Sequence, residues 1–273
     1  MLKEITLGQF FPGDSLLHKT DPRAKIILTL LYIVGIFTAK NVFSFLFVVL
    51  FTLLLVAISK IPLKIILKGM KPVIYVVAFT AVINIFWTKG ETPLFEFGFI
   101  RVYPEGLKFA GLMIIRIIAL LSGTGVVLTY TTSPIALTDG LERLLAPLKK
   151  LKMPVHEFSM MMTIALRFIP TLIEETDKIM SAQKARGADF SQGSLINRAK
   201  ALIPVMIPLF VSAFRRADDL AVAMECRCYR GDVGRTRMTE LHMKPLDWLM
   251  FALFLLFVAG IIVINIFAPG FSI

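Results

Sequence analysis

The sequence predicts an all-α polytopic membrane protein, with about five transmembrane helices and a helical region outside the membrane that carries two arginine-centred helix ends. Three observations support this fold class. Apolar residues make up 56% of the chain, above the share in ordinary globular domains. Several apolar stretches approach the roughly 20 residues that a helix needs to cross a hydrocarbon layer of about 30 Å. Basic residues gather in particular connections between these stretches.

The expected spans follow one another closely until a long interruption before the last. They are Ile26–Thr38, Val42–Ser59, Val73–Trp87, Leu107–Thr129 and Leu246–Phe267. The first and the third are short and would borrow flanking residues. Charged residues between Asp14 and Arg23 rule out the apolar core of a cleaved signal peptide, so we expect the first span to remain in the mature protein.

The net charge of +11 indicates topology rather than nucleic-acid binding. The connection after the second span is rich in lysine, whereas the connection after the first holds only Lys40. A dense basic set also runs from Arg143 to Lys244. Because basic residues favour the cytoplasmic side, we expect the N-terminus inside and the C-terminus outside. No recognition module accompanies the charge, so we expect no nucleic-acid partner.

These assignments divide the chain into four parts. Residues 1–25 are a cytoplasmic N-terminal segment, 26–132 a four-span membrane region, 133–245 a set of cytoplasmic helices, and 246–273 the last span with an outside C-terminus.

Two connections have patterns of their own. Lys60, Lys64 and Lys68 recur every four residues among apolar residues, which predicts a short separate helix in the cytoplasmic interface. The alternation that includes Phe95 and Phe99 predicts either a small hairpin or an ordered loop.

Three helices are expected between the fourth and the fifth span. Ser133 and Pro134 supply an N-cap and a first-turn proline for the first of them. Apolar residues at helical spacing predict the second from about His156 to Lys184 and the third from about Asn197 to Glu225.

The ends of the second and third helices form a weak internal repeat. A shift of 41 residues, from 186 to 227, brings Asp177 onto Asp218 and Arg186 onto Arg227. Each copy places an arginine between small residues, in Ala185-Arg186-Gly187 and in Cys226-Arg227-Cys228. Small neighbours let a partner's backbone approach, Gly187 can end its helix, and a planar guanidinium fits a carboxylate in a partner's groove. For one copy alone a solvated arginine at a helix C-terminus is the better interpretation, but the repetition favours partner contact.

No residue pattern typical of catalysis is found. Glycine-rich loops of the phosphate-binding form are missing, and the three histidines lie in separate segments without metal-ligand spacing. We therefore expect no catalytic residue, no metal site and no cofactor. The spans carry no acidic residue at depth, which argues against an ion-coupled carrier. Arg116, near the middle of the fourth span, is interpreted either as a structural residue or as a substrate contact.

Motifs along essentially the whole chain resemble the transmembrane T component of energy-coupling factor (ECF) transporters, which import vitamins and metals. The N-terminal motifs are Pro12-Gly13-Asp14-Ser15-Leu16-Leu17-His18 and Asp21-Pro22-Arg23-Ala24-Lys25. Ala185-Arg186-Gly187 matches the family's Ala-Arg-Gly signature. The second signature departs from that pattern, because Cys226 and Cys228 stand where the family has alanine and glycine.

The resemblance implies a non-catalytic energy-coupling subunit in a prokaryotic cytoplasmic membrane, with a multi-pass chain and the N-terminus inside. Two ATP-binding cassette ATPase subunits would bind the two helix ends, which act as coupling helices. The contact residues would be Ala185, Arg186, Gly187, Cys226, Arg227 and Cys228. A separate small membrane protein, the S component, would capture the vitamin or metal and be moved by ATP-driven closure.

Apolar faces of the same helices are then expected to hold the S component. The expected contacts are Met160, Met161, Leu202, Val205, Met206 and Leu209. Methionine suits a surface that repacks against different partners, so we expect several interchangeable S components as well as membrane lipid around the spans. Ordinary core methionines are the alternative.

Other function classes compete with this interpretation. A self-sufficient channel or secondary carrier would transport without partners, and a membrane scaffold would not transport at all. The lack of acidic residues in the spans weighs against the carrier. If an S component binds the substrate, this chain does not encode which vitamin or metal is moved.

Overall fold

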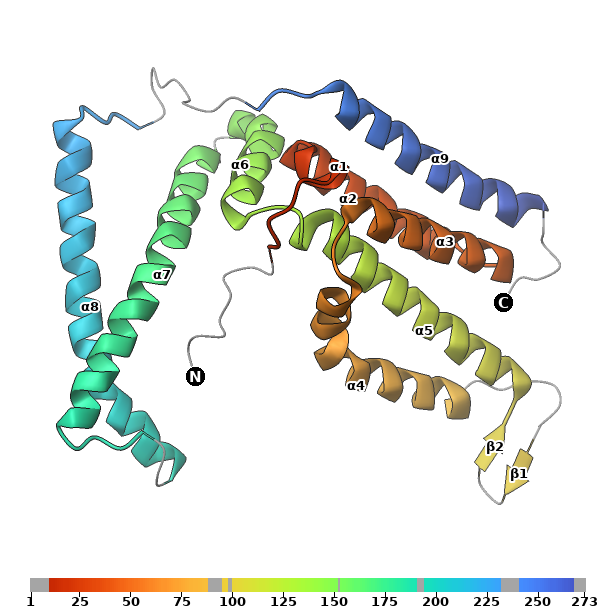
Figure 1. The fold of residues 1–273 in the computed structure, drawn as a ribbon, viewed down its shortest axis with the longest axis horizontal. Coiled ribbons are helices and arrows are strands. Elements are labelled where there is room, and N and C mark those ends of the chain that lie inside the picture. Colours follow the sequence, from red (N-terminus) through yellow and green to blue (C-terminus); the bar gives the residue numbers. More distant parts are fainter. Residues whose placement is uncertain are drawn as a thin grey trace. The chain divides into compact units, whose positions relative to one another are not determined.

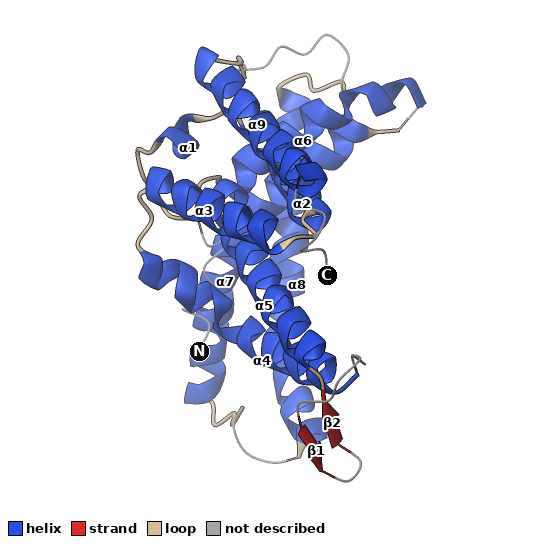
Figure 2. Cartoon of the chain, turned by 90° about the vertical axis from the view of Figure 1, so that its right-hand side faces the viewer, coloured by secondary structure: helices blue, strands red, loops and turns tan. Residues whose placement is uncertain are grey.

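The computed structural model of the chain describes residues 10–87, 95–97, 100–151, 153–190, 194–231 and 241–267. The described residues are mostly helical, and the chain divides into two compact units (Figure 1, Figure 2). The bundle unit comprises Gly8–Leu141 and Leu241–Ile273, and the α7–α8 unit comprises Met1–Leu7 and Glu142–Glu240. The division at Glu142 falls within α6, Pro134–Leu145. The first residues of α6 therefore belong to the bundle unit, although the sequence placed the whole of 133–245 in one cytoplasmic region.

The bundle unit is built from long helices joined mostly by short connections. They are α1 Leu16–Lys19, α2 Pro22–Thr38, α3 Val42–Ser59, α4 Leu63–Trp87, α5 Pro104–Thr124 and α9 Pro245–Phe267, with the π-helix Gly125–Thr129 continuing α5. α2 packs against α5 and α9, α3 packs against the same two helices, and α4 lies along α5. α9 follows the long interruption in sequence, yet it lies beside the first helices of the chain (Figure 1).

Length and composition make five described helices able to cross a membrane. They are Val42–Ser59, Leu63–Trp87, Pro104–Thr129, Ile196–Cys226 and Pro245–Phe267. Four of them contain expected spans, which confirms an all-α polytopic membrane protein. The expected first span, Ile26–Thr38, lies within α2, whose 17 residues cover about 25 Å.

α8, Leu195–Cys226, meets the length and composition of a span although the sequence placed it outside the membrane. Its uncharged stretch is short, from Ala201 to Phe214, because Lys200 and Arg215 flank it. Such a stretch covers about 21 Å as a helix, less than the roughly 30 Å of the hydrocarbon core. This length is typical of a helix that lies in an interface or packs on protein.

α4 corrects the expectation of a separate interface helix at Lys64 and Lys68. The helix begins at Leu63 and continues through Pro72 to Trp87, so the expected interface helix and the expected third span are one element. Proline removes one helical hydrogen bond and bends a helix, but neighbouring helices can support the bend. Periodicity in the sequence does not distinguish such a bend from a break. Lys60, expected in the same helix, instead ends α3 in a left-handed conformation with φ 56°.

The connection between α4 and α5 contains a small hairpin. Strand β1, Phe95–Phe97, pairs antiparallel with β2, Ile100–Val102, and Phe95 lies opposite Val102. Of the two alternatives left open by the sequence, the hairpin is therefore confirmed. Phe99, part of the pattern that predicted it, lies outside the described residues.

An aromatic cluster forms the centre of the bundle unit. The rings of Phe51 and Phe257 stack with centroids 4.0 Å apart, and Tyr32 stacks on Phe257 at 5.7 Å. The Tyr32 hydroxyl donates to the Ala119 carbonyl at 2.9 Å, so this buried polar group is satisfied as a low-dielectric interior requires. A Cβ on Gly123 would lie 2.3 Å from the Tyr32 ring, so only glycine allows α5 to approach α2 this closely.

The N-terminal motif Asp21-Pro22-Arg23-Ala24-Lys25 starts α2 and ties it to distant segments. Asp21 caps the helix by accepting from the Arg23 amide at 2.8 Å, and its own amide donates to Asp247 of α9 at 2.8 Å. The buried Lys25 ammonium donates to the Thr131 carbonyl at 2.8 Å. These contacts join the start of α2 to Thr131, which precedes the α7–α8 unit in sequence, and to α9, which follows it.

Candidate docking site

Two long helices dominate the α7–α8 unit, and the residues expected to contact the ATPases and the S component lie on them or in the two residues that follow each helix. The two helices are α7, Val155–Ala185, and α8, and they follow α6, Pro134–Leu145, and the 3₁₀ helix Ala146–Leu151. Ser133 caps α6 as expected, accepting from the Ala136 amide at 3.2 Å. Within the unit, buried His156 at the start of α7 lies 3.0 Å from the carboxylate of Glu142.

α7 and α8 run in opposite directions and pack on each other (Figure 1). Near the end of α8 the Tyr229 hydroxyl contacts the Met160 sulfur, near the start of α7, at 3.2 Å. Farther along α7, the Arg216 guanidinium pairs with the Glu175 carboxylate. Contacts at both levels hold the two helices as one antiparallel pair.

The end of α7 is a complete Schellman motif. The Gly187 amide donates to the Lys184 carbonyl at 3.0 Å, and the Ala188 amide donates to the Gln183 carbonyl at 3.0 Å. Gly187 has φ +89°, the left-handed conformation that turns the chain away from the helix axis. The prediction that Gly187 ends this helix is confirmed. Arg186 is the C-cap residue and is exposed.

The end of α8 repeats both of these hydrogen bonds. The Cys228 amide donates to the Glu225 carbonyl at 2.8 Å, and the Tyr229 amide donates to the Met224 carbonyl at 3.0 Å. Cys228 takes the glycine position with φ 57°, and Arg227 is the exposed C-cap residue. The cysteines that depart from the family signature therefore leave the helix ending unchanged. Both cysteines are free and exposed.

The repeat also explains a contact that the sequence analysis missed. Glu175 and Arg216 are 41 residues apart, the same shift that superposes the two helix ends, and they pair with each other. Equivalent positions meet in this way when two helices are related by an approximate two-fold axis, as at an isologous interface. Opposite charges at equivalent positions of the repeat were the sequence signal that could have revealed this ion pair.

Residues expected to contact the S component differ in exposure. Met161 is 59% exposed, Met206 48% and Leu202 41%, whereas Met160 and Leu209 are half-buried. Val205 is only 3% exposed, which corrects its assignment: it packs inside the α7–α8 unit and is not free for a partner. Exposed side chains that the sequence analysis omitted extend the apolar face of α8: Ile203, Ile207, Phe210, Val211 and Phe214.

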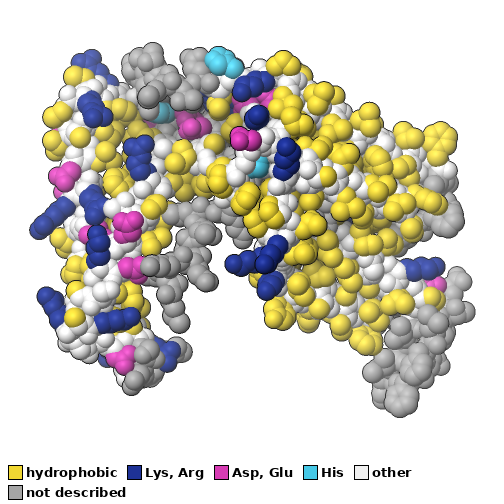
Figure 3. All heavy atoms as spheres, in the orientation of Figure 1, with side chains coloured by type: hydrophobic (Ala, Val, Ile, Leu, Met, Phe, Trp, Pro, Cys, Tyr) yellow, Lys and Arg dark blue, Asp and Glu magenta, His cyan; other side chains and the backbone are white. Residues whose placement is uncertain are grey.

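The surfaces of the two units differ in charge. Figure 3 shows a broad hydrophobic surface on the bundle unit and many basic side chains spread over α7 and α8. A surface dominated by apolar side chains is stable against lipid, whereas charged side chains need water or a partner.

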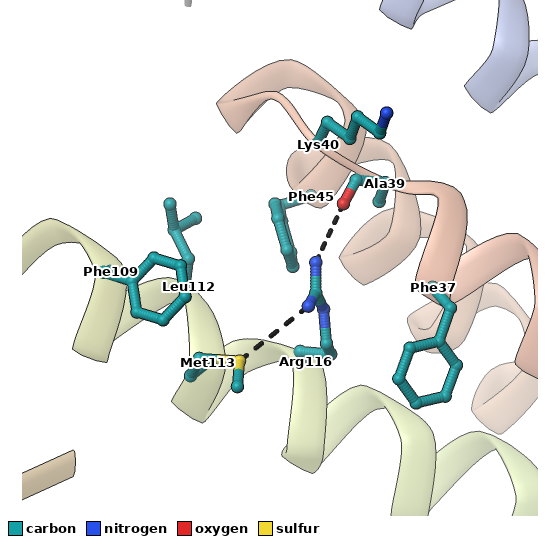
Figure 4. Close-up of a pocket in the computed structure, with 8 residues that line it drawn as sticks. All are labelled: Phe37, Ala39, Lys40, Phe45, Phe109, Leu112, Met113 and Arg116. Atoms are coloured by element: carbon teal, nitrogen blue, oxygen red, sulfur yellow. Dashed lines mark hydrogen bonds between the residues drawn. The ribbon is translucent and has the colours of Figure 1, made fainter. Parts of the chain in front are cut away.

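Arg116 of α5 lies in the bundle unit, apart from the helix ends. Its guanidinium donates to the Ala39 carbonyl at 2.9 Å and lies over the Phe45 ring, 5.0 Å from the centroid (Figure 4). Ala39 is the C-cap of α2, so the charge sits at the negative end of a helix dipole. The side chain thus reaches the α2–α3 connection, although its Cα was expected near the middle of a span.

Comparison with known proteins places the chain in a family. The CbiQ family, described as a cobalt transport protein, matches residues 13–240. The chain belongs to the CbiQ family. It is 54% identical over 265 residues to the energy-coupling factor transporter transmembrane protein EcfT of Ruminiclostridium cellulolyticum, covering 97% of this chain and 98% of the relative.

Other relatives carry the same name. EcfT of Clostridium kluyveri is 55% identical over 250 residues, covering 91% and 92% of the two chains. EcfT of Bacillus subtilis is 48% identical over 241 residues, covering 88% and 91%. The expected resemblance to the T component of ECF transporters is confirmed, and the chain is a transmembrane transporter subunit.

Proposed function

We propose that this chain is the energy-coupling subunit of an ECF-type importer, in which two ATPase subunits dock on the ends of α7 and α8. The observation that carries the proposal is the pair of matching Schellman ends, each with an exposed arginine at the C-cap. Two equivalent sites suit two equivalent partners. ATP hydrolysis belongs to those partners, and this chain supplies no catalytic group.

Each docking site is proposed to work by burial of a guanidinium against a carboxylate. The left-handed residue after each arginine turns the chain aside, which leaves the C-cap side chain projecting from the end of its helix. A planar guanidinium forms two parallel hydrogen bonds with a carboxylate. It is also more weakly hydrated than an ammonium, so its transfer from water into a groove costs less free energy. The flanking small residues let the groove close around it.

Movement of the two ATPases would then act on the antiparallel pair as a unit. Because contacts near Met160 and at Glu175 join the helices, displacement of one helix end is transmitted to the other helix. We propose that this motion carries the apolar face of α8 with it. That face is the proposed seat of the S component, with Leu202 and Met206 among its contacts.

The apolar face of α8 supports several interchangeable S components. Met206 of α8 and Met161 of the neighbouring α7 are exposed and unbranched, and such side chains repack readily against surfaces of different shape. Its uncharged run is too short to cross a bilayer, which favours a protein partner at the membrane surface. The basic α7–α8 unit is accordingly proposed to be cytoplasmic, with the N-terminus inside.

Isolation of the tagged chain from its own membrane tests the proposal. We expect two nucleotide-binding subunits and a small membrane protein to co-purify, and we expect ATP-dependent uptake when the set is placed in liposomes. Uptake by the chain alone would instead identify a channel or secondary carrier. Partners without ATP-dependent uptake would identify a scaffold.

A further inference from the structure

The cavity beside Arg116 is a site that the coupling role leaves unused. It has a volume of about 120 Å³ and is lined by residues of α2, α3, α5 and the α2–α3 connection (Figure 4). Pockets for drug-sized ligands measure roughly 300–1,000 Å³, so this cavity is too small for a vitamin. A water takes up about 30 Å³ in the liquid, so the space suits a group with a few oxygen atoms.

The guanidinium of Arg116 has donors left over in this cavity. One terminal nitrogen donates to the Ala39 carbonyl at 2.9 Å, and the other has only the weak acceptor sulfur of Met113 at 3.8 Å. The Nε atom is buried and has no hydrogen-bond partner among the described residues. An unpaired buried donor of a charged group is costly, and an anionic oxygen would satisfy it.

The remaining lining combines a second cation with apolar walls. Lys40 is exposed at the rim, with its ammonium directed away from Arg116, free to turn toward a bound group (Figure 4). Phe37, Phe109 and Leu112 form apolar walls, and Phe37 is 61% exposed. Among the described residues, no acidic side chain lines the cavity. The cavity therefore offers positive charge beside surface that favours hydrocarbon.

We infer that this cavity binds the phosphate of an anionic phospholipid, with acyl chains lying over the aromatic walls. A lipid is favoured over a free phosphate ion because the cations are set among side chains that face the membrane. Arg116 itself lies midway along Pro104–Thr129, but its guanidinium donates to Ala39, in the connection where α2 ends and α3 begins. Irregular connections between membrane helices lie outside the hydrocarbon, so this connection places the cavity at the level of the headgroups. With the proposed topology this is the outer leaflet.

The experiment measures thermal unfolding of the full chain, with its co-purified partners, in neutral detergent. Phosphatidylglycerol, phosphatidylcholine with the same acyl chains, and inorganic phosphate are titrated separately. We expect phosphatidylglycerol alone to raise the unfolding midpoint. Arg116→Gln should raise the concentration needed by about tenfold or more, and Lys40→Gln should raise it less, as expected for loss of charge-assisted contacts. Lys178→Gln, which removes an exposed lysine of α7, is the matched control and should respond like the unaltered chain.

Several results would overturn the inference. An equal response to phosphatidylcholine would mean that the headgroup charge is not read, and an equal response to inorganic phosphate would mean that no lipid is required. If Arg116→Gln does not fold, an unchanged response in Lys40→Gln still contradicts the site. If the unfolding midpoint depended on a carboxylate of a co-purified partner and not on added lipid, the cavity would be assigned to a protein contact. The readout needs no ATP, so failure of the coupling proposal leaves it intact.

Discussion

The helix ends at Arg186 and Arg227 share their backbone geometry but differ in the residue that turns the chain. Gly187 adopts its left-handed conformation with no Cβ to strain, whereas Cys228 adopts φ 57° against a steric cost of about 1–2 kcal/mol. The two Schellman hydrogen bonds are the same at both ends nevertheless. The comparison teaches that the ending is imposed by the Schellman bonds and the surrounding chain, and that glycine eases it without being required.

Removal of both arginines should have the largest effect. Arg186→Ala and Arg227→Ala each leave a partner's carboxylate unpaired, at a cost of about 2–5 kcal/mol, so the double variant should lose ATPase binding and uptake. Membrane insertion should be normal. Co-purification and uptake assays measure this, with Arg215→Ala, an exposed arginine within α8, as the control. Normal uptake by the double variant would contradict the docking proposal.

A bulky maleimide should separate the two ends. Cys226 and Cys228 are the only two cysteines and both are exposed, so the reagent modifies the second end alone. We expect each modified chain to retain one ATPase in place of two, as counted by native mass spectrometry. The variant Cys226→Ala with Cys228→Gly recreates the Ala-Arg-Gly sequence of the first end; it should assemble fully and resist the reagent. Two ATPases on a modified chain would show that the second end does not dock one.

Substitution of the turning residue should affect the ends in opposite directions. Gly187→Ala should weaken the end of α7 by about 1 kcal/mol, because alanine is strained at φ +89°. Cys228→Gly should relieve strain and strengthen the end of α8 by a few tenths of a kcal/mol, since glycine's added freedom when unfolded offsets part of the gain. Hydrogen exchange of the Ala188 and Tyr229 amides reports each end. Equal protection in all variants would contradict the assigned cost.

The smallest effect is expected at the contact between the helices. Glu175 and Arg216 are partly exposed, so Glu175→Gln or Arg216→Gln should each cost about 0.2–1 kcal/mol. The exchanged pair, Glu175→Arg with Arg216→Glu, should recover most of the loss, because the two positions are equivalent in the repeat. A double-mutant cycle in thermal unfolding measures the coupling. Additive losses would mean that the ion pair does not join the helices.

Much of the helical framework could be predicted from the sequence. Long apolar runs predict membrane helices because a helix satisfies its own backbone hydrogen bonds within the hydrocarbon layer. Ser133 and Gly187 predict helix boundaries through their capping chemistry. The 41-residue shift between Arg186 and Arg227 also required only the sequence. Local rules of this kind depend on residues close together along the chain.

Other features depended on contacts between distant segments. The sequence predicted a separate interface helix around Lys64 and a span from Val73, but in the structure one helix, packed along α5, contains both. Val205 is as apolar as its exposed neighbours, and it is buried because it lies on the side of α8 that is covered in the folded unit. Hydrophobicity alone does not tell which side of the helix is covered.

Arg116 shows the same distinction at a single residue. Its position in an apolar run indicated an unusual charge, because a guanidinium in hydrocarbon needs a partner. Its partners, the Ala39 carbonyl and the Phe45 ring, lie about 70 to 80 residues away in the chain and are brought to it by the packing of α2 and α3 on α5. The chemistry of each side chain was readable along the chain, whereas the neighbours that complete that chemistry were assembled by helix packing.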